Sequence, residues 1–192
     1  MKRYRYIGHP QIQVQQGMVL VAALVILLAL TLIGVSAMGT STLEERMSSN
    51  DRDRQIAFQA AELALRNGER EVEAGITATS FDNTCTKGLC DCYTAATRKC
   101  RDNGSTLEYW EDGINWTDAN RHRETASLTI EASSPPKYII EFMGYVMPDA
   151  APVGYSPGPN QGDPEMYRIT ALAVGQTPAA RVMLQSTYRR QP

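Results

Sequence analysis

Four cysteines close to one another are the residues with the clearest chemistry in this chain. Cys85, Cys90, Cys92 and Cys100 have the spacing C-x4-C-x-C-x7-C, in a stretch rich in threonine, asparagine, aspartate and glycine. Such a group forms two disulfides in an oxidising compartment and binds zinc through thiolates in a reducing one. The paired C-x2-C spacing typical of zinc sites is absent, which favours disulfides.

Ring size bears on how these cysteines pair. A bond between Cys90 and Cys92 would close a very tight ring, so the spacing favours Cys85 with Cys90 and Cys92 with Cys100. The alternative of Cys85 with Cys92 and Cys90 with Cys100 stays open. In either pairing the bonds restrict the unfolded chain and stabilise a segment that is too polar to bury itself.

The rest of the sequence has no catalytic arrangement. His122 lies between Arg121 and Arg123, which favours a solvated surface position, and His9 is the only other histidine. There is no Ser/His/Asp or Cys/His arrangement and no glycine-rich phosphate loop. We therefore expect a protein that is not an enzyme and needs no cofactor.

A turn-rich stretch, residues 147–165, offers a weak candidate for metal binding. Asn160, Asp163 and Glu165 carry the oxygen ligands that calcium prefers, but they fit no EF-hand spacing. Such residues are also typical of ordinary turns. The sequence favours a long loop without a metal, and a calcium ion or a partner is the alternative.

Three aromatic residues, Tyr109, Trp110 and Trp116, lie in the same polar region as the cysteines. Exposed on a loop, they would form a binding surface. In a domain with few large apolar residues we expect instead that they pack as a lid over a sheet.

An apolar helix is the first of the elements that must position these residues. From Met18 to Met38 the sequence MVLVAALVILLALTLIGVSAM has no charge. At about 1.5 Å per residue this stretch spans roughly the 30 Å hydrocarbon core of a bilayer. It is apolar on all sides, which predicts a transmembrane helix rather than a buried helix of a soluble domain.

The flanks of this segment predict its orientation. Residues 1–17 contain Lys2, Arg3 and Arg5 and no acid, so the positive-inside rule places them in the cytoplasm and everything after Met38 outside it. That oxidising location favours the disulfides. The chain has a net charge of −2 and residues 18–192 carry −5, which gives no reason to expect nucleic-acid binding.

The helix is predicted to continue beyond the membrane. Apolar residues recur at three-, four- and seven-residue steps from Ser41 to about Ala74, and Gly75 suits the C′ position. Gly34 and Gly39 each weaken a helix by about 0.5 to 1 kcal/mol relative to alanine. They predict a bend, local melting or close helix packing near the membrane exit.

Three runs rich in β-branched, aromatic and aliphatic residues predict strands at Tyr138–Val146, Met166–Val174 and Ala180–Tyr188. The short link at residues 175–178 suits an antiparallel hairpin. The predicted fold class is therefore α+β, with a long N-terminal helix packed on a small antiparallel sheet and a disulfide-stapled loop between them.

The start of the apolar helix resembles that of a type IV prepilin. A short basic leader ends in Gln-Gln-Gly at Gly17, and the uninterrupted apolar segment follows directly. Residues 17–69 are similar to the amino-terminal region of PilX-type minor pilins, including an Arg-Asp-Arg-Gln step and an alanine-rich segment from Ala57 to Leu65. The resemblance implies the type IV pilin fold.

The same resemblance implies a processing step and a role. A prepilin peptidase would cut between Gly17 and Met18 and methylate the new amino terminus on Met18. The helix would first anchor the subunit in the inner membrane and later pack in a filament. The implied role is to prime type IV pilus assembly and join the pilus tip complex, which supports twitching motility and adhesion. The implied partners are other minor pilins, the major pilin, a PilY-type tip adhesin and the inner-membrane assembly platform.

One position departs from the pilin pattern. Most pilins have a glutamate at the fifth mature position, which pairs with the amino terminus of a neighbouring subunit, and this chain has Ala22 there. A carboxylate without a partner is costly in hydrocarbon. We expect a subunit of the tip or initiating complex, and the alternative is that Ala22 is simply suited to a membrane helix.

The predicted organisation has five segments. They are a cleaved leader (1–17), a transmembrane half-helix (18–38), an amphipathic half-helix (39–75), a cysteine-containing αβ loop (76–135) and a sheet region (136–192). Two other functions fit this organisation. One is a minor pseudopilin of a type II secretion system, and the other is a single-pass anchored periplasmic protein that binds a partner through the cysteine loop and the two tryptophans.

Overall fold

The computed structural model describes residues 16–93, 100–101, 105–125, 131–159 and 161–191. The predicted leader up to residue 15, with His9, and Asn160 of the 147–165 loop lie outside these residues. The chain divides into two compact units, residues 1–48 and 49–192.

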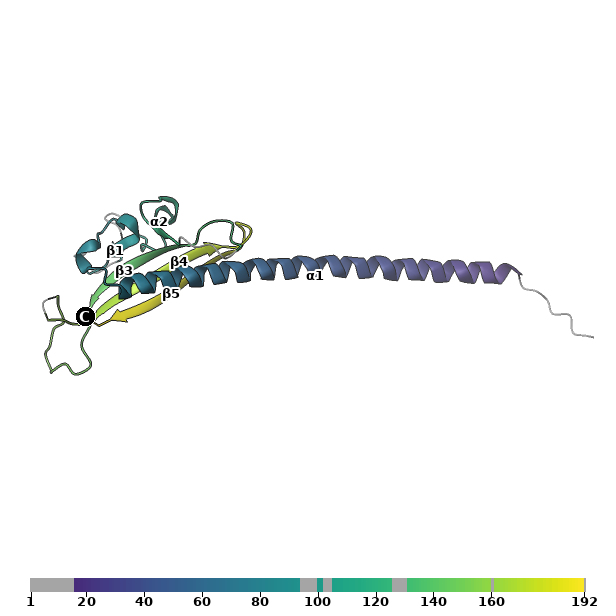
Figure 1. Cartoon of the computed structure of the whole chain (residues 1–192). Coiled ribbons are helices and arrows are strands. Elements are labelled where there is room, and N and C mark those ends of the chain that lie inside the picture. Colours follow the sequence, from purple (N-terminus) through teal and green to yellow (C-terminus); the bar gives the residue numbers. More distant parts are fainter. Residues whose placement is uncertain (1–15, 94–99, 102–104, 126–130, 160, 192) are drawn as a thin grey trace, which may run out of the picture. The chain divides into compact units, whose positions relative to one another are not determined.

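One long helix, α1 (Gln16–Glu73), runs through both units (Figure 1). Gly75 follows its end with a φ of +98°, a conformation that glycine adopts without steric cost. The Arg190 guanidinium donates hydrogen bonds to the carbonyl oxygens of Val72 and Ile76, 3.2 and 3.0 Å away. A positive charge thus binds the helix C-terminus, where the helix dipole favours it.

The remaining elements are short helices and strands: η1 (Ala78–Ser80), η2 (Thr86–Gly88), β1 (Leu89–Asp91), α2 (Gly113–Thr117), β2 (Arg123–Glu124), β3 (Lys137–Tyr145), β4 (Glu165–Val174) and β5 (Arg181–Arg190). Over the described residues, the strands form one sheet of order β1-β3-β4-β5, and β2 pairs with β3. A long helix with this sheet confirms the predicted α+β class.

The three predicted strands are confirmed to within two residues at each end. β3, β4 and β5 pair antiparallel, with Ile140 opposite Ile169 and Ile169 opposite Ser186. In β5, half-buried residues such as Val182 alternate with exposed residues such as Met183. This alternation means that β5 presents one face to the interior and the other to solvent.

One part of the sheet was not predicted. β1 contains the second cysteine, Cys90, and pairs parallel with β3, with Leu89 opposite Ile140. The sheet is therefore mixed rather than purely antiparallel, and the αβ loop contributes a strand to it.

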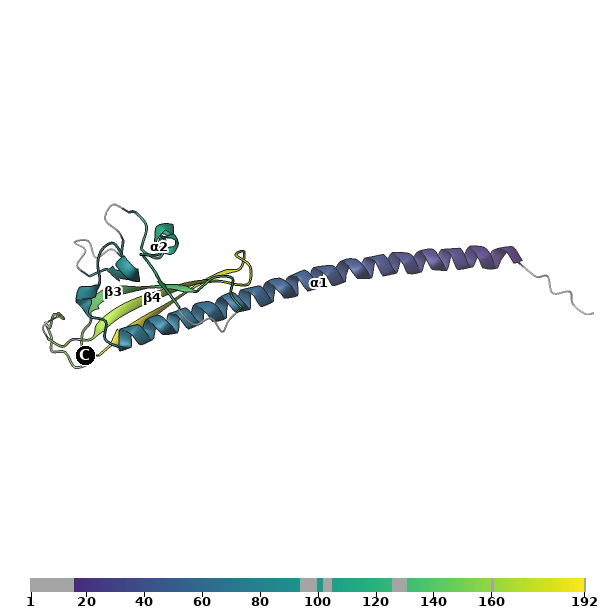
Figure 2. The ribbon, with the colours of Figure 1, turned by 45° about the horizontal axis from the view of Figure 1, so that its top comes forward.

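The second half of α1 lies along the inner face of the sheet (Figure 2), and small residues make the contact. Ala60 and Ala61 are fully buried and form a cluster with Ala173 of β4. Further along the helix, fully buried Ala64 joins the larger core around Ile169. Alanine side chains allow the helix to approach the sheet closely, so the larger residues of the strands fill the space between.

The αβ loop and α2 lie over the opposite, outer face of the sheet (Figure 2). Tyr109 and Trp116 are buried there against Ile139, and Trp110 and Leu172 are partly buried at the edge of the same cluster. The predicted lid of aromatic residues is confirmed for Tyr109 and Trp116.

Candidate functional site

The first half of α1 presents its large apolar side chains to the surroundings. Between Met18 and Met38 these side chains are more than half exposed, from 56% at Leu28 to 72% at Met38. In the part of the chain that the structure describes, α1 is the one helix long and apolar enough to cross a membrane. The hydroxyl of Thr31 donates to the carbonyl oxygen of Leu28 at 2.8 Å, so it needs no partner in the bilayer.

Gly34 in this half-helix and Gly39 directly after it are not required by any close contact within their own unit. A Cβ added at Gly34 or at Gly39 would meet no atom within 4 Å. Ala22 lies on the same exposed stretch. The space that these small residues leave open is available to another helix.

Two disulfides staple the αβ loop, Cys85 to Cys90 and Cys92 to Cys100, which are the pairs that ring size favoured. All four residues are buried. Since every sulfur is in a disulfide, the four-cysteine zinc alternative is wrong. For the same reason, the cluster of Cys92, Cys100 and Glu141 offers no thiolate to a metal.

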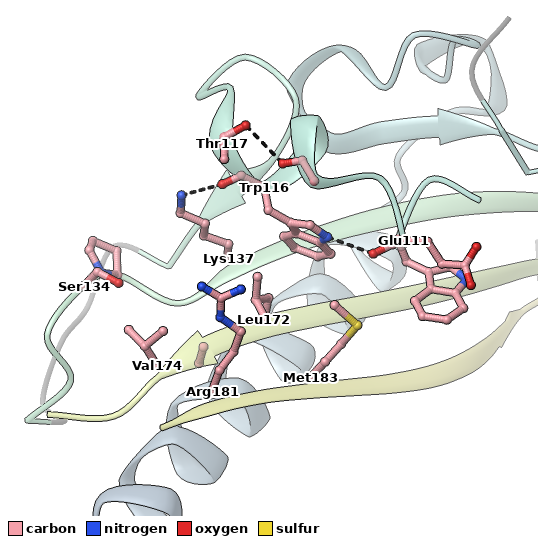
Figure 3. A pocket seen from close by; sticks show the side chains of 13 residues that line it. Glu111, Trp116, Thr117, Ser134, Lys137, Leu172, Val174, Arg181 and Met183 are labelled. Carbon is pink, nitrogen blue, oxygen red and sulfur yellow. Dashed lines mark hydrogen bonds between the residues drawn. The ribbon is translucent and has the colours of Figure 1, made fainter. Parts of the chain in front are cut away.

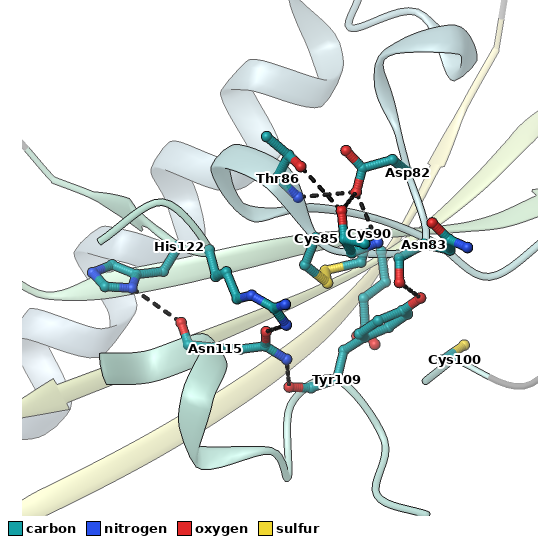
Figure 4. The surroundings of a disulfide bond; sticks show 12 residues. Asp82, Asn83, Cys85, Thr86, Cys90, Cys100, Tyr109, Asn115 and His122 are labelled. Atoms are coloured by element: carbon teal, nitrogen blue, oxygen red, sulfur yellow. Dashed lines mark hydrogen bonds between the residues drawn. A yellow bond between two sulfur atoms is a disulfide. The ribbon is translucent and has the colours of Figure 1, made fainter. Parts of the chain in front are cut away.

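A hydrogen-bonded turn leads into the first disulfide (Figure 4). One carboxylate oxygen of Asp82 accepts from the backbone nitrogens of Thr84 and Thr86, 2.9 and 3.0 Å away. Partial burial acts to raise the pKa of Asp82, but hydrogen bonds from Thr86 and Thr84 outweigh it and lower that pKa. The ionised carboxylate therefore holds the chain in the bend that brings Cys85 to Cys90.

His122 is buried, which contradicts the predicted surface position. Its side chain is only 2% exposed. Its Nδ1 donates to the carbonyl oxygen of Asn115 at 3.0 Å, while the amide of Asn115 donates to the carbonyl oxygen of Tyr109 at 2.7 Å (Figure 4). The basic neighbours in the sequence indicated a solvated position for the ring. In the structure the ring is buried and hydrogen-bonded to the backbone carbonyl of Asn115 in α2, and this contact orders the αβ loop.

A buried ion pair joins β3 and β4 under the αβ loop. Glu141 is fully buried and accepts two hydrogen bonds from Arg168, 2.7 and 2.8 Å long. Arg168 also donates to Glu108 at 3.1 Å, and Glu108 accepts from the indole nitrogen of Trp110 at 2.7 Å. Burial raises the pKa of Glu141, and the two hydrogen bonds from Arg168 act against that rise. The network ties the loop to the sheet and fixes the ring of Trp110.

The two acids of the 147–165 loop that the structure describes are occupied within the fold. Asp163 is 3% exposed, accepts from the Tyr155 hydroxyl, and accepts from the backbone nitrogen of Gly158 at 2.9 Å. Glu165 forms an ion pair with Arg190. These contacts favour an ordinary structured turn over a calcium site, because each carboxylate already has donors from the protein.

A groove lies on the outer face of the sheet where the cover of the αβ loop ends (Figure 3). We call it the outer groove, and its volume is about 590 Å³. It is lined by aromatic, apolar and basic residues, among them Trp110, Trp116, Lys137, Leu172, Arg181 and Met183. It was not predicted, although the two tryptophans that form it were named as a candidate binding surface.

Asp53 of α1 binds the tip of the β4–β5 hairpin. Asp53 accepts from the backbone nitrogen of Thr177 at 3.2 Å and from its hydroxyl. The hydrogen bond from the Thr177 hydroxyl is the main cause that lowers the pKa of Asp53. Gly175 lies so close to Asp53 that a Cβ there would overlap it. Asp53 thus fixes the tip of the hairpin on the helix.

Comparison with family models assigns almost the whole chain. The model of the PilX N-terminal domain matches residues 16–66, and the model of the type IV pilus assembly protein PilX C-terminal domain matches residues 76–190. The chain belongs to the PilX family of type IV pilus assembly proteins. The chain matches no curated protein and no solved structure.

Membership of the PilX family accounts for both units. The N-terminal match covers the apolar half of α1 and its continuation, and the C-terminal match covers the αβ loop and the sheet. The PilX family is structural and is not known for enzymatic activity. The apolar helix of the described residues is compatible with a membrane anchor, which agrees with a minor pilin.

Proposed function

We propose that this PilX-family chain is a minor pilin that helps to prime type IV pilus assembly and forms part of the pilus tip complex. The observation that carries the proposal is the exposed apolar surface of residues 18–38, on a helix that continues without a break into the globular unit. Such a surface needs lipid before assembly and neighbouring helices afterwards. The role is structural and requires no catalysis.

In the proposed order of events, processing of the leader comes first. Prepilin peptidase cuts between Gly17 and Met18, removes residues 1–17 and methylates Met18. Before assembly, residues 18–38 anchor the subunit in the inner membrane with the globular unit in the periplasm. The subunit then leaves the bilayer for the pilus, because contacts with sister helices replace contacts with lipid at little net hydrophobic cost.

The composition of this surface supports a place at the tip. Ala22 has no carboxyl group to offer to the amino terminus of a neighbour. Gly34 and Gly39 leave open space for a neighbouring helix. The partners that this role requires are other minor pilins, the major pilin, a PilY-type tip adhesin and the assembly platform. In this role the protein supports twitching motility and adhesion.

The position of the subunit in the filament tests the tip proposal. Gold labelling of the wild-type chain should mark one end of sheared pili. A glutamate introduced by Ala22→Glu should allow the chain to appear along the shaft, because the carboxylate can pair with an amino terminus. Ala23→Glu is the matched control, since it adds the same charge one residue away, and it should not produce shaft labelling. Wild-type label spread evenly along the pili would contradict the tip proposal.

Loss of the gene tests the priming role. Deletion should abolish or strongly reduce surface pili and twitching, and an intact copy should restore both. Normal piliation in a strain without a redundant copy would contradict priming.

A further inference from the structure

The outer groove exists because the αβ loop covers only part of the outer sheet face. Trp116 is 8% exposed and packs toward the fully buried Ile139, so the cover of the αβ loop extends over that part of β3. Over β5 it is absent, and Met183 is 39% exposed. The groove therefore has one wall from the αβ loop and a floor from β4 and β5 (Figure 3).

The wall of the outer groove is held in place by hydrogen bonds. The indole nitrogen of Trp116 donates to the carbonyl oxygen of Trp110 at 2.9 Å. The indole nitrogen of Trp110 donates to Glu108, which Arg168 fixes to the buried Glu141. A ligand would find both rings already oriented, so little conformational entropy would be lost on binding.

Two basic residues lie at one end of the outer groove (Figure 3). The ammonium of Lys137 donates to the carbonyl oxygen of Trp116 at 2.8 Å, which leaves two of its hydrogens for a ligand. Arg181 is exposed, and no described residue accepts a hydrogen bond from its guanidinium. Glu111 lies at the other end, so the charge along the groove is polarised.

We propose that the outer groove is a docking site for an extended segment of a partner protein that carries a bulky apolar side chain next to a carboxylate. The apolar side chain lies between the tryptophan wall and the floor of Leu172 and Met183. The carboxylate binds Arg181 and Lys137. Tryptophan, methionine and arginine are the residues that recur at the energetic centres of protein interfaces. The proposal goes beyond the proposed function and does not rest on it.

The size and charge of the outer groove select this occupant. A volume of about 590 Å³ exceeds the space that one side chain fills, and the groove opens along β5, which suits a chain rather than a single small molecule. A guanidinium that has no acceptor among the described residues and lies beside an apolar floor is suited to a carboxylate, which it can bind through two parallel hydrogen bonds. A basic segment would place like charges together at this end.

Trp110 and Trp116 are the only tryptophans of the chain, so intrinsic fluorescence reports on the outer groove alone. The full chain in nanodiscs of zwitterionic lipid is titrated with a pool of short peptides that have a fixed Leu-Glu core, randomised flanks and no aromatic residues. A saturable change in tryptophan emission is expected. A matched pool with a Leu-Lys core should give no saturable change.

Variants of the chain separate specific docking from a general effect. Arg181→Ala should weaken binding of the Leu-Glu pool by about tenfold, as expected for the loss of one charge-assisted contact. Met183→Glu should abolish binding by placing a carboxylate in the groove. Arg66→Ala is the matched control, because Arg66 is an exposed cation on α1, and binding should stay unchanged.

Three results would overturn the proposal. The first is no saturable change with the Leu-Glu pool, and the second is equal binding by the chain with and without Arg181. The third is octanoate binding as tightly as the peptides, since this would identify a small anionic amphiphile as the ligand.

Discussion

The two halves of α1 differ in what their apolar residues contact: those of the first half are exposed, and those of the second half pack on the sheet. Between Met18 and Met38 the half-helix carries large aliphatic side chains, and they are exposed. In the second half, alanines such as Ala60 and Ala64 are fully buried against the sheet. A helix that packs on its own domain needs small residues for close approach, whereas large apolar residues on all sides require a non-aqueous surrounding.

The residues of the two half-helices are therefore constrained by different contacts. Substitutions in the second half act on the folding of the globular unit. Under the proposed function, substitutions in the first half act on contacts with lipid and with neighbouring subunits.

The largest effect is expected from the buried ion pair. Arg168→Leu leaves the fully buried Glu141 without its partner, and we expect it to lower the free energy of unfolding by about 3–5 kcal/mol. Leu28→Ala in the first half-helix should leave it unchanged. Chemical denaturation of the full chain in nanodiscs, followed by tryptophan fluorescence, measures both.

The double variant Glu141→Leu with Arg168→Leu is the control for the ion pair. It removes both charges, so most of the lost stability should return. An Arg168→Leu variant as stable as the wild type would contradict the structural role of the pair.

A smaller effect is expected from the second disulfide. Replacing Cys92 and Cys100 together by serine should lower the free energy of unfolding by about 2–4 kcal/mol, because the unfolded chain gains freedom. The loss should also release the αβ loop from the outer face and shift tryptophan emission to longer wavelength. Unchanged stability with unchanged emission would mean that the hydrogen bonds alone hold the loop.

Two glycines of α1 offer a direct comparison of its halves. Gly68→Ala places a Cβ 2.7 Å from a methyl carbon of Ile169, so we expect a loss of about 1–3 kcal/mol despite the better helix propensity. Gly34→Ala meets no atom within 4 Å and should leave the stability of the globular unit unchanged. Thermal unfolding of the two variants measures the difference, and equal melting temperatures would contradict it.

The smallest effect on the stability of the folded state is expected at the tip of the β4–β5 hairpin. The pKa of Asp53 is lowered mainly by the hydrogen bond from the Thr177 hydroxyl, so the folded state favours the ionised form. This contribution to stability is present above the ordinary aspartate pKa of about 3.9 and is lost as the pH falls through the lowered value.

The Thr177 amide resonance should therefore titrate in acid with a midpoint below that of an ordinary aspartate, and Asp53→Asn should remove the titration. A midpoint at the ordinary value or above it would contradict the attachment of the hairpin to the helix.

Local patterns were sufficient to predict the long helix and the three main strands, and they favoured the disulfide pairs that the structure has. The apolar segment is unambiguous because no charged residue interrupts it. β5 alternates because one of its faces is exposed. Ring size among four close cysteines restricts the pairing to few alternatives. Each of these features depends on residues near one another in the sequence.

The features that were missed depend on distant residues. β1 is short and becomes a strand only because β3 lies beside it. His122 is buried where the backbone carbonyl of Asn115 in α2 accepts a hydrogen bond from its ring, and its neighbours in the sequence do not reveal this contact. The outer groove lies where the αβ loop leaves part of the outer sheet face uncovered. Only the folded chain brings these distant residues together.

The amino terminus of the mature protein tests the central claim most directly. Mass spectrometry of the protein purified from its own cells should find a chain that begins at Met18 with a methylated amine, as expected for a helix freed for assembly into a pilus. A chain that begins at Met1 would contradict the account and identify the apolar helix as a permanent anchor.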